Sequence, residues 1–351
     1  MPLHQNIQRL LLVGVHLDAP PAPAIPEPPS RLRPLIESLA SAHRAFDEIA
    51  IRHGHRYRSG FWAIYLLSAA AVLCAMMPLA LGWDSMTSFM HPFAAGWAIA
   101  EVAVIAAVGV IYWRGHHNDW QGAWLRARTV AELTSYLPLI APLVDFSAVR
   151  AEQAGHRAPN WYPRALGPEQ HPLGTPEVAE LCGKNERQAR ELLDSAWSDP
   201  QFVFAYGAWA IGVLRAQQAY HKRVAERSHA LQHRVHRITA VLFTLTAVGA
   251  LAHLIVHSRW LSLITTVFPA LAASLHGALA QSETYRLHAT SERVALELRN
   301  AVVEIQRSLD MAVADSDAAP LKGAIRSAVA LILEEHQDWH MLVKPHHLPL
   351  G

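Results

Sequence analysis

Four long apolar stretches, each bordered by polar and charged sequence, dominate the hydrophobic pattern of this 351-residue chain. They cover residues 61–82, 92–113, 238–256 and 260–281, and Glu101 is the one Asp, Glu, Lys or Arg among them. Each stretch is close to the roughly 20 residues that an α-helix needs to cross the hydrocarbon core of a bilayer. Lipid offers no hydrogen bonds to the backbone, so an inserted run of this length must be helical. The pattern therefore predicts four transmembrane helices.

The four spans fall into two pairs, and each pair is joined by a short loop. Lysine and arginine gather before and after each pair, whereas loop 83–91 has none and loop 257–260 has only Arg259. The positive-inside rule places such basic flanks in the cytoplasm. Aromatic residues such as Trp62 and Trp113 stand at the span ends, as interfacial anchors do. We therefore expect the two short loops to face outward, and both termini and the long middle section to be cytoplasmic.

The order polar helix, two spans, polar helix occurs twice, over residues 34–145 and 213–314. Both predicted hairpins enter the membrane from the cytoplasm, so the repeats are parallel, unlike the inverted repeats of many secondary transporters. The predicted fold is all-α: an integral membrane protein with four transmembrane helices in two parallel tandem hairpins with cytoplasmic helical stalks. Residues 1–33 are predicted to form a tail and a proline-rich linker, 146–212 a cytoplasmic linker region, and 315–351 a C-terminal helix and tail.

Two short apolar segments lie outside the spans. Residues 10–17 precede several prolines and lack a suitable cleavage site, so we expect a short strand or helix here and no cleavable signal peptide. Residues 201–214 are apolar and aromatic but too short to cross a membrane. Attachment to the membrane interface and packing on the stalks are both compatible with this second segment.

The stalks predicted after the second and fourth spans, residues 119–136 and 282–314, carry helical side-chain patterns. Arg128 and Glu132 are four residues apart in the first stalk and can form an ion pair on one helix face. The second stalk carries an apolar stripe at heptad-like spacing, which consists of Val294, Leu298, Val302, Ile305 and Leu309. Such a stripe needs a partner helix in the same chain or in a neighbouring copy. We expect the stalks to pack into a cytoplasmic bundle.

Composition and motifs argue against several other classes of protein. The chain is 52% hydrophobic and only 17% charged, where about 25% charged is typical. Its formal net charge of +1 gives no overall attraction for nucleic acid. Gly-rich phosphate loops, GxSxG and CxxC motifs are absent. His336 and His340 have the spacing of zinc-protease ligands, but Gln337 occupies the position of the general base. We expect no enzyme, catalytic residue, metal or cofactor, and no nucleic-acid partner.

Glu101 is the sharpest candidate for a functional residue, because it lies near the middle of the second span. A charge at this depth costs roughly 2.5–3.5 kcal/mol on insertion scales, so the carboxyl group should face other helices or water. A functional role would be to line a pore or to titrate with protons. The structural alternative is a protonated carboxyl bonded to a neighbouring helix, for which the candidate partners are Ser68, Thr244, Thr246 and His253.

Other polar residues lie within the spans of the second hairpin. His253 and His276 stand towards the ends of their spans, where either pH-dependent gating or simple solvation at the interface would suit them. Thr244 and Thr246 can line a conduction path or favour close helix packing. The arginines in residues 52–58 can contact anionic lipid, and positive-inside anchoring explains them equally well.

The residues that follow the second span carry a resemblance to a known family. Trp124-Leu125-Arg126-Ala127-Arg128 and Ala131-Glu132-Leu133 look like the Trp, Arg and Ala-Glu-Leu stretch of the SLATT superfamily, a group of prokaryotic two-helix transmembrane effectors. In the second unit, Tyr285-Arg286 and Ser291-Glu292 resemble the same stretch with a longer spacing. The resemblance covers roughly residues 41–314 and implies two tandem copies of the domain.

This resemblance implies a function in the bacterial inner (cytoplasmic) membrane. Members of the family are associated with sensors or synthases of nucleotide signals in antiphage and other conflict systems, and are proposed to form pores. We therefore expect an oligomeric pore-forming or membrane-disrupting effector that associates with itself in the lipid bilayer. Its cytosolic nucleotide-sensing or nucleotide-synthesising partner would be a separate protein. The alternatives are a non-conducting membrane anchor or scaffold for a cytosolic sensor, and a small-solute channel or transporter.

Overall fold

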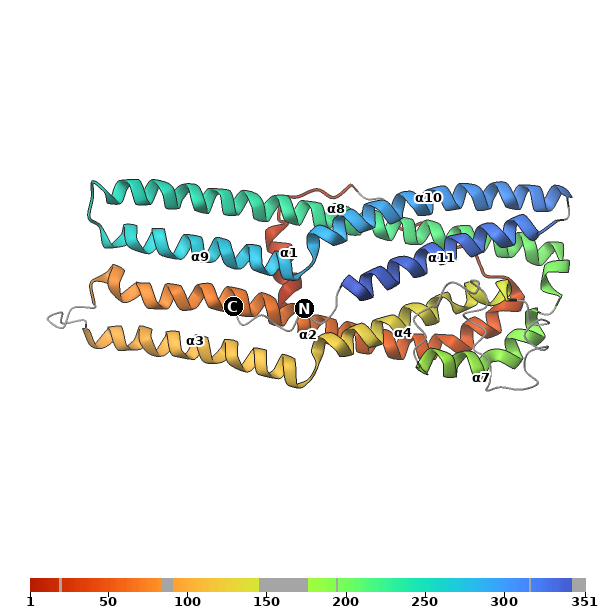
Figure 1. Ribbon diagram of the computed structural model, residues 1–351, viewed down its shortest axis with the longest axis horizontal. Coiled ribbons are helices and arrows are strands. Elements are labelled where there is room, and N and C mark those ends of the chain that lie inside the picture. Colours follow the sequence, from red (N-terminus) through yellow and green to blue (C-terminus); the bar gives the residue numbers. More distant parts are fainter. Residues whose placement is uncertain (19–20, 84–90, 145–175, 194, 316, 343–351) are drawn as a thin grey trace.

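All regular secondary structure in the described residues of a computed structural model, which are 1–18, 21–83, 91–144, 176–193, 195–315 and 317–342, is helical. Two very long helices, α2 (Arg33–Leu81) and α8 (Pro200–His253), extend along the length of the molecule, and α9 (Arg259–Gln281) lies between their apolar segments (Figure 1). At about 1.5 Å per residue, their 49 and 54 residues extend over about 74 and 81 Å. Each long helix contains a polar segment and an apolar segment without a break between them.

Shorter helices return along each long helix in two steps. Helices α3 (His91–His117) and α4 (Trp120–Ile140) pack in turn against α2, and α9 and α10 (Thr284–Asp315) pack in turn against α8. Helices α2 and α9 also pack together and join the two sets (Figure 1). The close approach depends on Gly277, where an added Cβ would lie 2.3 Å from a ring carbon of Tyr65.

Three further helices complete the arrangement. Helices α7 (Pro176–Leu193) and α11 (Ala319–Leu342) lie at the end of the molecule that holds α4 and α10 (Figure 1). Helix α1 (Leu3–Leu11) crosses between α2 and α8 near the middle of the long axis (Figure 1). The short element expected at residues 10–17 was wrong in its bounds, because α1 ends at Leu11 and residues 12–17 form a turn and irregular chain. The buried face of α1 is formed by His4 together with partly buried Ile7 and Leu11.

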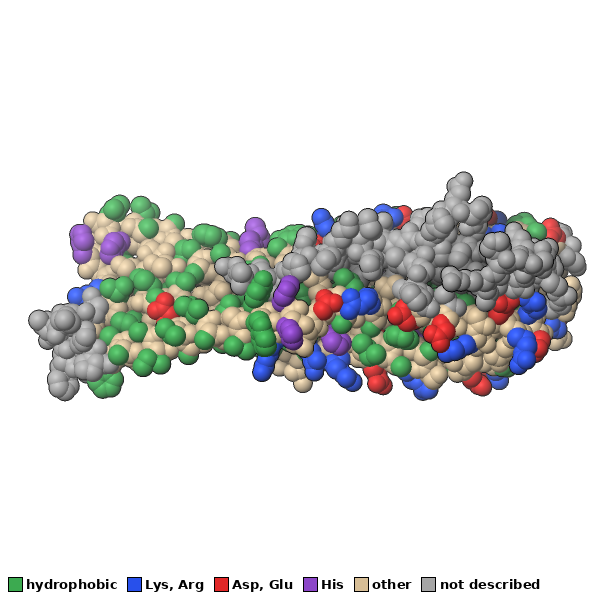
Figure 2. Space-filling model, turned by 60° about the horizontal axis from the view of Figure 1, so that its bottom comes forward, with side chains coloured by type: hydrophobic (Ala, Val, Ile, Leu, Met, Phe, Trp, Pro, Cys, Tyr) green, Lys and Arg blue, Asp and Glu red, His purple; other side chains and the backbone are tan. Residues whose placement is uncertain are grey.

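The two ends of the molecule differ in chemistry. Figure 2 shows charged side chains gathered over the end with α4 and α7, and apolar side chains over the opposite end. Four helical segments are long and apolar enough to cross a membrane, and they lie in α2, α3, α8 and α9. Few residues of these segments are buried, and none is buried in the most apolar part of α3. The large apolar residues exposed there include Ile99, Val102, Leu251, Leu254 and Ile255.

The main hydrophobic core lies at the charged end, between α2, α4, α7, α8, α10 and α11. The stripe predicted on the second stalk is confirmed as a core-facing stripe, because Val294, Leu298, Val302, Ile305 and Leu309 are all buried there. The segment 201–214 also packs into this core rather than lying exposed, through residues that include Phe202, Tyr206 and Leu214. It forms the first turns of α8, which begin at Pro200 behind Asp199, whose carboxylate accepts a hydrogen bond of 3.0 Å from Gln201 N.

Candidate functional site

Glu101 lies partly exposed on α3 and makes no hydrogen bond or ion pair with any residue that the structure describes. The hydroxyls proposed as its partners bond to their own helices instead. Thr244 donates to Ala240 O at 2.9 Å and Thr246 donates to Leu242 O at 2.8 Å. Ser68 likewise donates to a carbonyl of its own helix, Ile64 O, at 2.9 Å. Within one chain, therefore, these hydroxyl groups do not form the hydrogen bond to a protonated Glu101 that was the structural alternative.

The two histidines of the second hairpin do not join Glu101 either. His253 is at the end of α8 with its ring 5.9 Å from the ring of His257, and its Nδ1 has no hydrogen-bond partner among the described residues. His276 is exposed on α9. No hydrogen bond or ion pair in the described ranges links any two of the five intramembrane candidates. A polar path through the spans of a single chain is therefore not formed by these residues.

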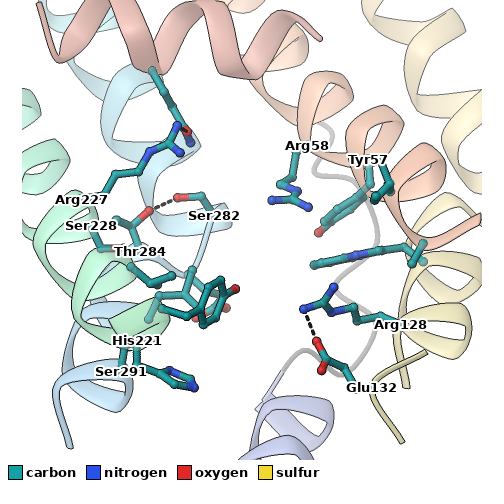
Figure 3. Close-up of a pocket in the computed structure, with 18 of the residues that line it drawn as sticks. Tyr57, Arg58, Arg128, Glu132, His221, Arg227, Ser228, Ser282, Thr284 and Ser291 are labelled. Atoms are coloured by element: carbon teal, nitrogen blue, oxygen red, sulfur yellow. Dashed lines mark hydrogen bonds and ion pairs between the residues drawn. The ribbon is translucent and has the colours of Figure 1, made fainter. Parts of the chain in front are cut away.

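A cavity of about 460 Å³ lies between the two sets of helices, where the charged end meets the apolar end. Helices α2 and α4 form one wall, and α8, the α9–α10 junction and α10 form the other (Figure 3). Gln8 of α1 and Ile332 of α11 also line it. Phe61 and Gln281, which stand at the ends of two predicted spans, are part of the lining, so the cavity lies at the expected level of the membrane surface.

The first wall of the cavity is a stack of aromatic and arginine side chains. The ring of Trp124 stacks on Tyr57 with centroids 5.8 Å apart, and the guanidinium of Arg58 lies over Trp124 at 5.2 Å. Gly54 permits this arrangement, because an added Cβ would lie 2.8 Å from the indole Nε1. Arg128 stands below the stack (Figure 3) and contacts Glu132, the ion pair expected from the i, i+4 spacing.

Arg128 also ties two helices together. Its guanidinium lies 3.5 Å from the carboxylate of Asp47 on α2 in addition to its contact with Glu132 on α4. Its charge is therefore neutralised by two carboxylates. Arg58 differs, because its Nε donates to Gly54 O at 3.2 Å and no carboxylate pairs with it in the described part of the chain. Burial lowers the pKa of Arg58, and the positive charges of Arg128 and Arg227 add to this effect.

The second wall of the cavity contributes one arginine and several hydroxyl groups. Arg227 donates to the side-chain oxygen of Gln8 at 2.8 Å and, like Arg58, has no carboxylate partner among the described residues. Ser228, Ser282 and Thr284 present hydroxyl groups on the same wall (Figure 3). His221 is buried beside them, and burial lowers its pKa to about 4, so its imidazole is neutral at physiological pH. The carboxylates in the lining are Glu132 and Glu283.

The breaks between the apolar and polar helices have the same backbone feature in both sets. Asp119 before α4 has φ 43° and Glu283 before α10 has φ 54°, a left-handed conformation that is uncommon for residues other than glycine. Asp119 caps α4 by accepting from Gly122 N at 3.1 Å and pairs with Arg126 at 2.9 Å. Because neither position is a glycine, the usual sequence signal for such a turn is missing.

Sequence reasoning did not find this cavity. Arg58 belonged to the basic flank of the first span, and Arg227 to that of the third, so both were assigned to membrane orientation. The sequence signal was that the leader of each unit is rich in arginine just before the predicted span, which does not single out Arg58 and Arg227. The possible zinc ligands His336 and His340 have side chains outside the described ones. Among the described residues, no group of three or more His, Cys, Asp or Glu side chains is placed to hold a metal ion.

The fold defines an all-helical protein with four helices long and apolar enough to cross a membrane. No protein-family model matches the chain, and no curated protein and no solved structure matches it. The argument for function therefore rests on the physical features of this chain.

Proposed function

We propose that this protein is an integral membrane effector, related to the SLATT superfamily, whose copies associate in the bacterial inner membrane and permeabilise it. It has no enzymatic activity in this proposal. The four apolar segments cross the bilayer as two parallel tandem hairpins, and both termini and the helical stalks are cytoplasmic. The observation that carries the proposal is Glu101, a carboxyl group in an apolar helical segment that has no partner among the described residues and lies on a helix little covered by its own chain.

The exposed apolar surface supports insertion. Soluble monomers seldom expose contiguous apolar patches larger than a few hundred Å². Here the exposed apolar side chains extend over four helices at one end of the molecule, as Figure 2 shows for one face. Immersion in lipid removes that surface from water, and the charged end remains in the aqueous phase. A protein–protein interface would have to cover all four helices to achieve the same effect.

Glu101 supports self-association and conduction. A lone carboxylate facing lipid costs roughly 2.5–3.5 kcal/mol on insertion scales, and its own chain supplies no hydrogen bond from the described residues to offset that cost. Helix α3 packs mainly against α2, so most of its surface is available to a second copy. Several copies that bring α3 helices together would surround Glu101 with polar groups or water. Such an arrangement provides a hydrated path across the bilayer.

Membrane potential in bacteria induced to make the protein tests this proposal. We expect the wild type to depolarise the cells, and Glu101→Ala to insert normally but to depolarise them at least about tenfold less. A tenfold loss corresponds to a change of about 1.4 kcal/mol in the free energy of forming the conducting assembly. The matched control is Glu48→Ala, which removes an exposed carboxylate from the polar part of α2.

The outcomes separate the candidate functions. Equal depolarisation by wild type and Glu101→Ala would retain the pore and remove Glu101 from its path. Normal potential in cells that contain inserted, assembled wild type, with and without its conflict-system partner, would refute permeabilisation and favour a non-conducting anchor or scaffold. Saturable flux of a defined solute without loss of viability would favour a channel or transporter.

A further inference from the structure

We propose that the cavity between the two sets of helices binds a phosphate group, carried either by the headgroup of an anionic lipid or by a phosphorylated solute. The ligands are the guanidinium groups of Arg58 and Arg227 on opposite walls, with hydroxyl groups of the α8 and α10 wall as further donors (Figure 3). This site goes beyond the proposed permeabilisation, and its binding is measured without reference to conduction.

Charge is the first argument for an anion. Three arginines line the cavity, and Arg128 is neutralised by Glu132 and Asp47. Arg58 and Arg227 have no carboxylate partner among the described residues. Two cationic groups, partly buried Arg58 and exposed Arg227, thus face one cavity, and the charge of Arg227 contributes to lowering the pKa of Arg58. A doubly charged anion between the two guanidinium groups would neutralise both positive charges, whereas a single carboxylate would neutralise only one.

Geometry favours phosphate over other anions. A guanidinium presents its N–H donors as a planar fork that matches two oxygens of a phosphate, and such charge-assisted bonds are stronger than neutral ones. The Arg58 fork is held in a fixed orientation by the Trp124 ring and by its bond to Gly54 O. Ser228 adds a hydroxyl donor on the opposite wall. A tetrahedral group with several oxygens can accept from both walls at once, whereas a planar carboxylate has only two oxygens.

The position of the cavity makes both sources of phosphate accessible. Phe61 at the start of the first span and Leu231, seven residues before the third, are part of the lining. This is the level at which lipid headgroups lie if the apolar segments are inserted. The volume of about 460 Å³ is also within the range of pockets that hold small molecules, roughly 300–1,000 Å³. The cavity therefore suits a headgroup that enters from the bilayer or a phosphorylated solute from the cytoplasm.

Binding would connect the two sets of helices and affect α1. Arg58 comes from α2 and Arg227 from α8, so a phosphate held by both fixes the distance between these two long helices. Arg227 now donates to Gln8 of α1. Because the phosphate would take the same guanidinium donors, it would compete with this contact between α1 and α8.

The test uses the purified full-length protein in a neutral detergent and in nanodiscs, with four variants. Arg58→Gln and Arg227→Gln each remove one proposed ligand, and Arg299→Gln is the matched control, since it removes an exposed arginine of α10 that does not line the cavity. Circular dichroism and size-exclusion chromatography establish that each variant is folded. Arg58→Lys keeps the charge but not the planar fork, so it tests the geometry separately.

Two probes distinguish the sources. Inorganic pyrophosphate is titrated calorimetrically in detergent, and lipid retention is measured by native mass spectrometry after reconstitution in phosphatidylcholine with or without phosphatidylglycerol. We expect at least one probe to bind the wild type and the Arg299→Gln control equally. We expect Arg58→Gln and Arg227→Gln to bind that probe about tenfold more weakly or worse, the loss that one charge-assisted hydrogen bond of about 1.5 kcal/mol predicts.

Each outcome decides the proposal. Pyrophosphate binding with this pattern identifies a soluble phosphorylated ligand, and selective retention of phosphatidylglycerol with this pattern identifies a lipid. Binding that is equal in all folded variants, or absent for both probes, would overturn the site. Membrane potential does not enter either measurement, so failure of the proposed permeabilisation and failure of this site are distinguishable.

Discussion

Replacing Gly54 by alanine tests the wall of the cavity through two opposing effects. Glycine within a helix is about 1 kcal/mol less favourable than alanine, so the change alone should stabilise α2. At this position, however, the added Cβ would lie 2.8 Å and 2.9 Å from two indole atoms of Trp124 and 3.0 Å from a guanidinium nitrogen of Arg58. Contacts this short require the indole ring to move.

Movement of the indole into the cavity that it lines would separate it from its two neighbours. One of its neighbours is the stacked ring of Tyr57, and the guanidinium of Arg58 lies over it. Overpacking of a well-packed site costs about 1–3 kcal/mol, and subtracting the gain in helix propensity leaves a net loss near 1 kcal/mol. Gly323→Ala is the matched control, because Gly323 is an exposed helical glycine with nothing within 4 Å of its added Cβ. It should gain about 1 kcal/mol, so the two variants should differ by about 2 kcal/mol.

Denaturant unfolding of the detergent-solubilised protein, followed by tryptophan fluorescence and helical circular dichroism, measures this difference. The expected order of stability is Gly323→Ala, then wild type, then Gly54→Ala. If Gly54→Ala is as stable as Gly323→Ala, the indole of Trp124 does not press against α2. The aromatic and arginine wall of the cavity would then have to be abandoned.

Two further predictions concern the stalk core and the docking of α1. Leu298→Ala should lower the free energy of unfolding by about 2–5 kcal/mol, because Leu298 is 0% exposed in the core, whereas Leu296→Ala, at 52% exposed, should change it by about 0.5 kcal/mol or less. Equal effects in denaturant unfolding would contradict the assigned orientation of α10. Burial lowers the pKa of His4 from 6.5 to about 4, with Arg58, His55 and Arg227 as further positive neighbours. Since protonation then favours the undocked histidine, docking of α1 should be complete above pH 6.5 and weaken as the pH falls towards 4. Hydrogen exchange of residues 3–11, corrected for intrinsic rates, should show this loss, and His4→Gln should flatten the pH dependence; unchanged protection at pH 4.5 would contradict it.

The elements that depend on local pattern were predictable from sequence. Four long apolar helical segments were expected and are found, because length and lack of charge are properties of each segment alone. The apolar stripe from Val294 to Leu309 was also predictable, since residues three and four apart lie on one face of any helix. Its partners were not, because they come from α8 and α11, and one stripe does not specify the surface that it contacts.

The cavity depends on positions that are distant in the sequence, which is why it was missed. Arg58 and Arg227 are separated by more than 160 residues, and their shared surroundings follow from the packing of α2 on α9 and from the crossing of α1. Arginines next to a span carry the same sequence signal whether they orient the protein or bind an anion. The two roles are separated by whether a carboxylate pairs with the arginine, which none does for Arg58 or Arg227 among the described residues, and pairing of that kind is a tertiary property.

The arrangement of continuous and broken helices gives the cavity mechanical importance. Helices α2 and α8 pass from the charged end into the apolar end without interruption, whereas the other two paths turn sharply at Asp119 and Glu283. A continuous helix transmits a change of position along its axis, and a sharp turn allows the helices on its two sides to move independently. Arg58 and Arg227 both stand on the continuous helices, close to the point where the apolar segments begin. A change in the distance between these two arginines must therefore move the apolar segments of α2 and α8 relative to each other.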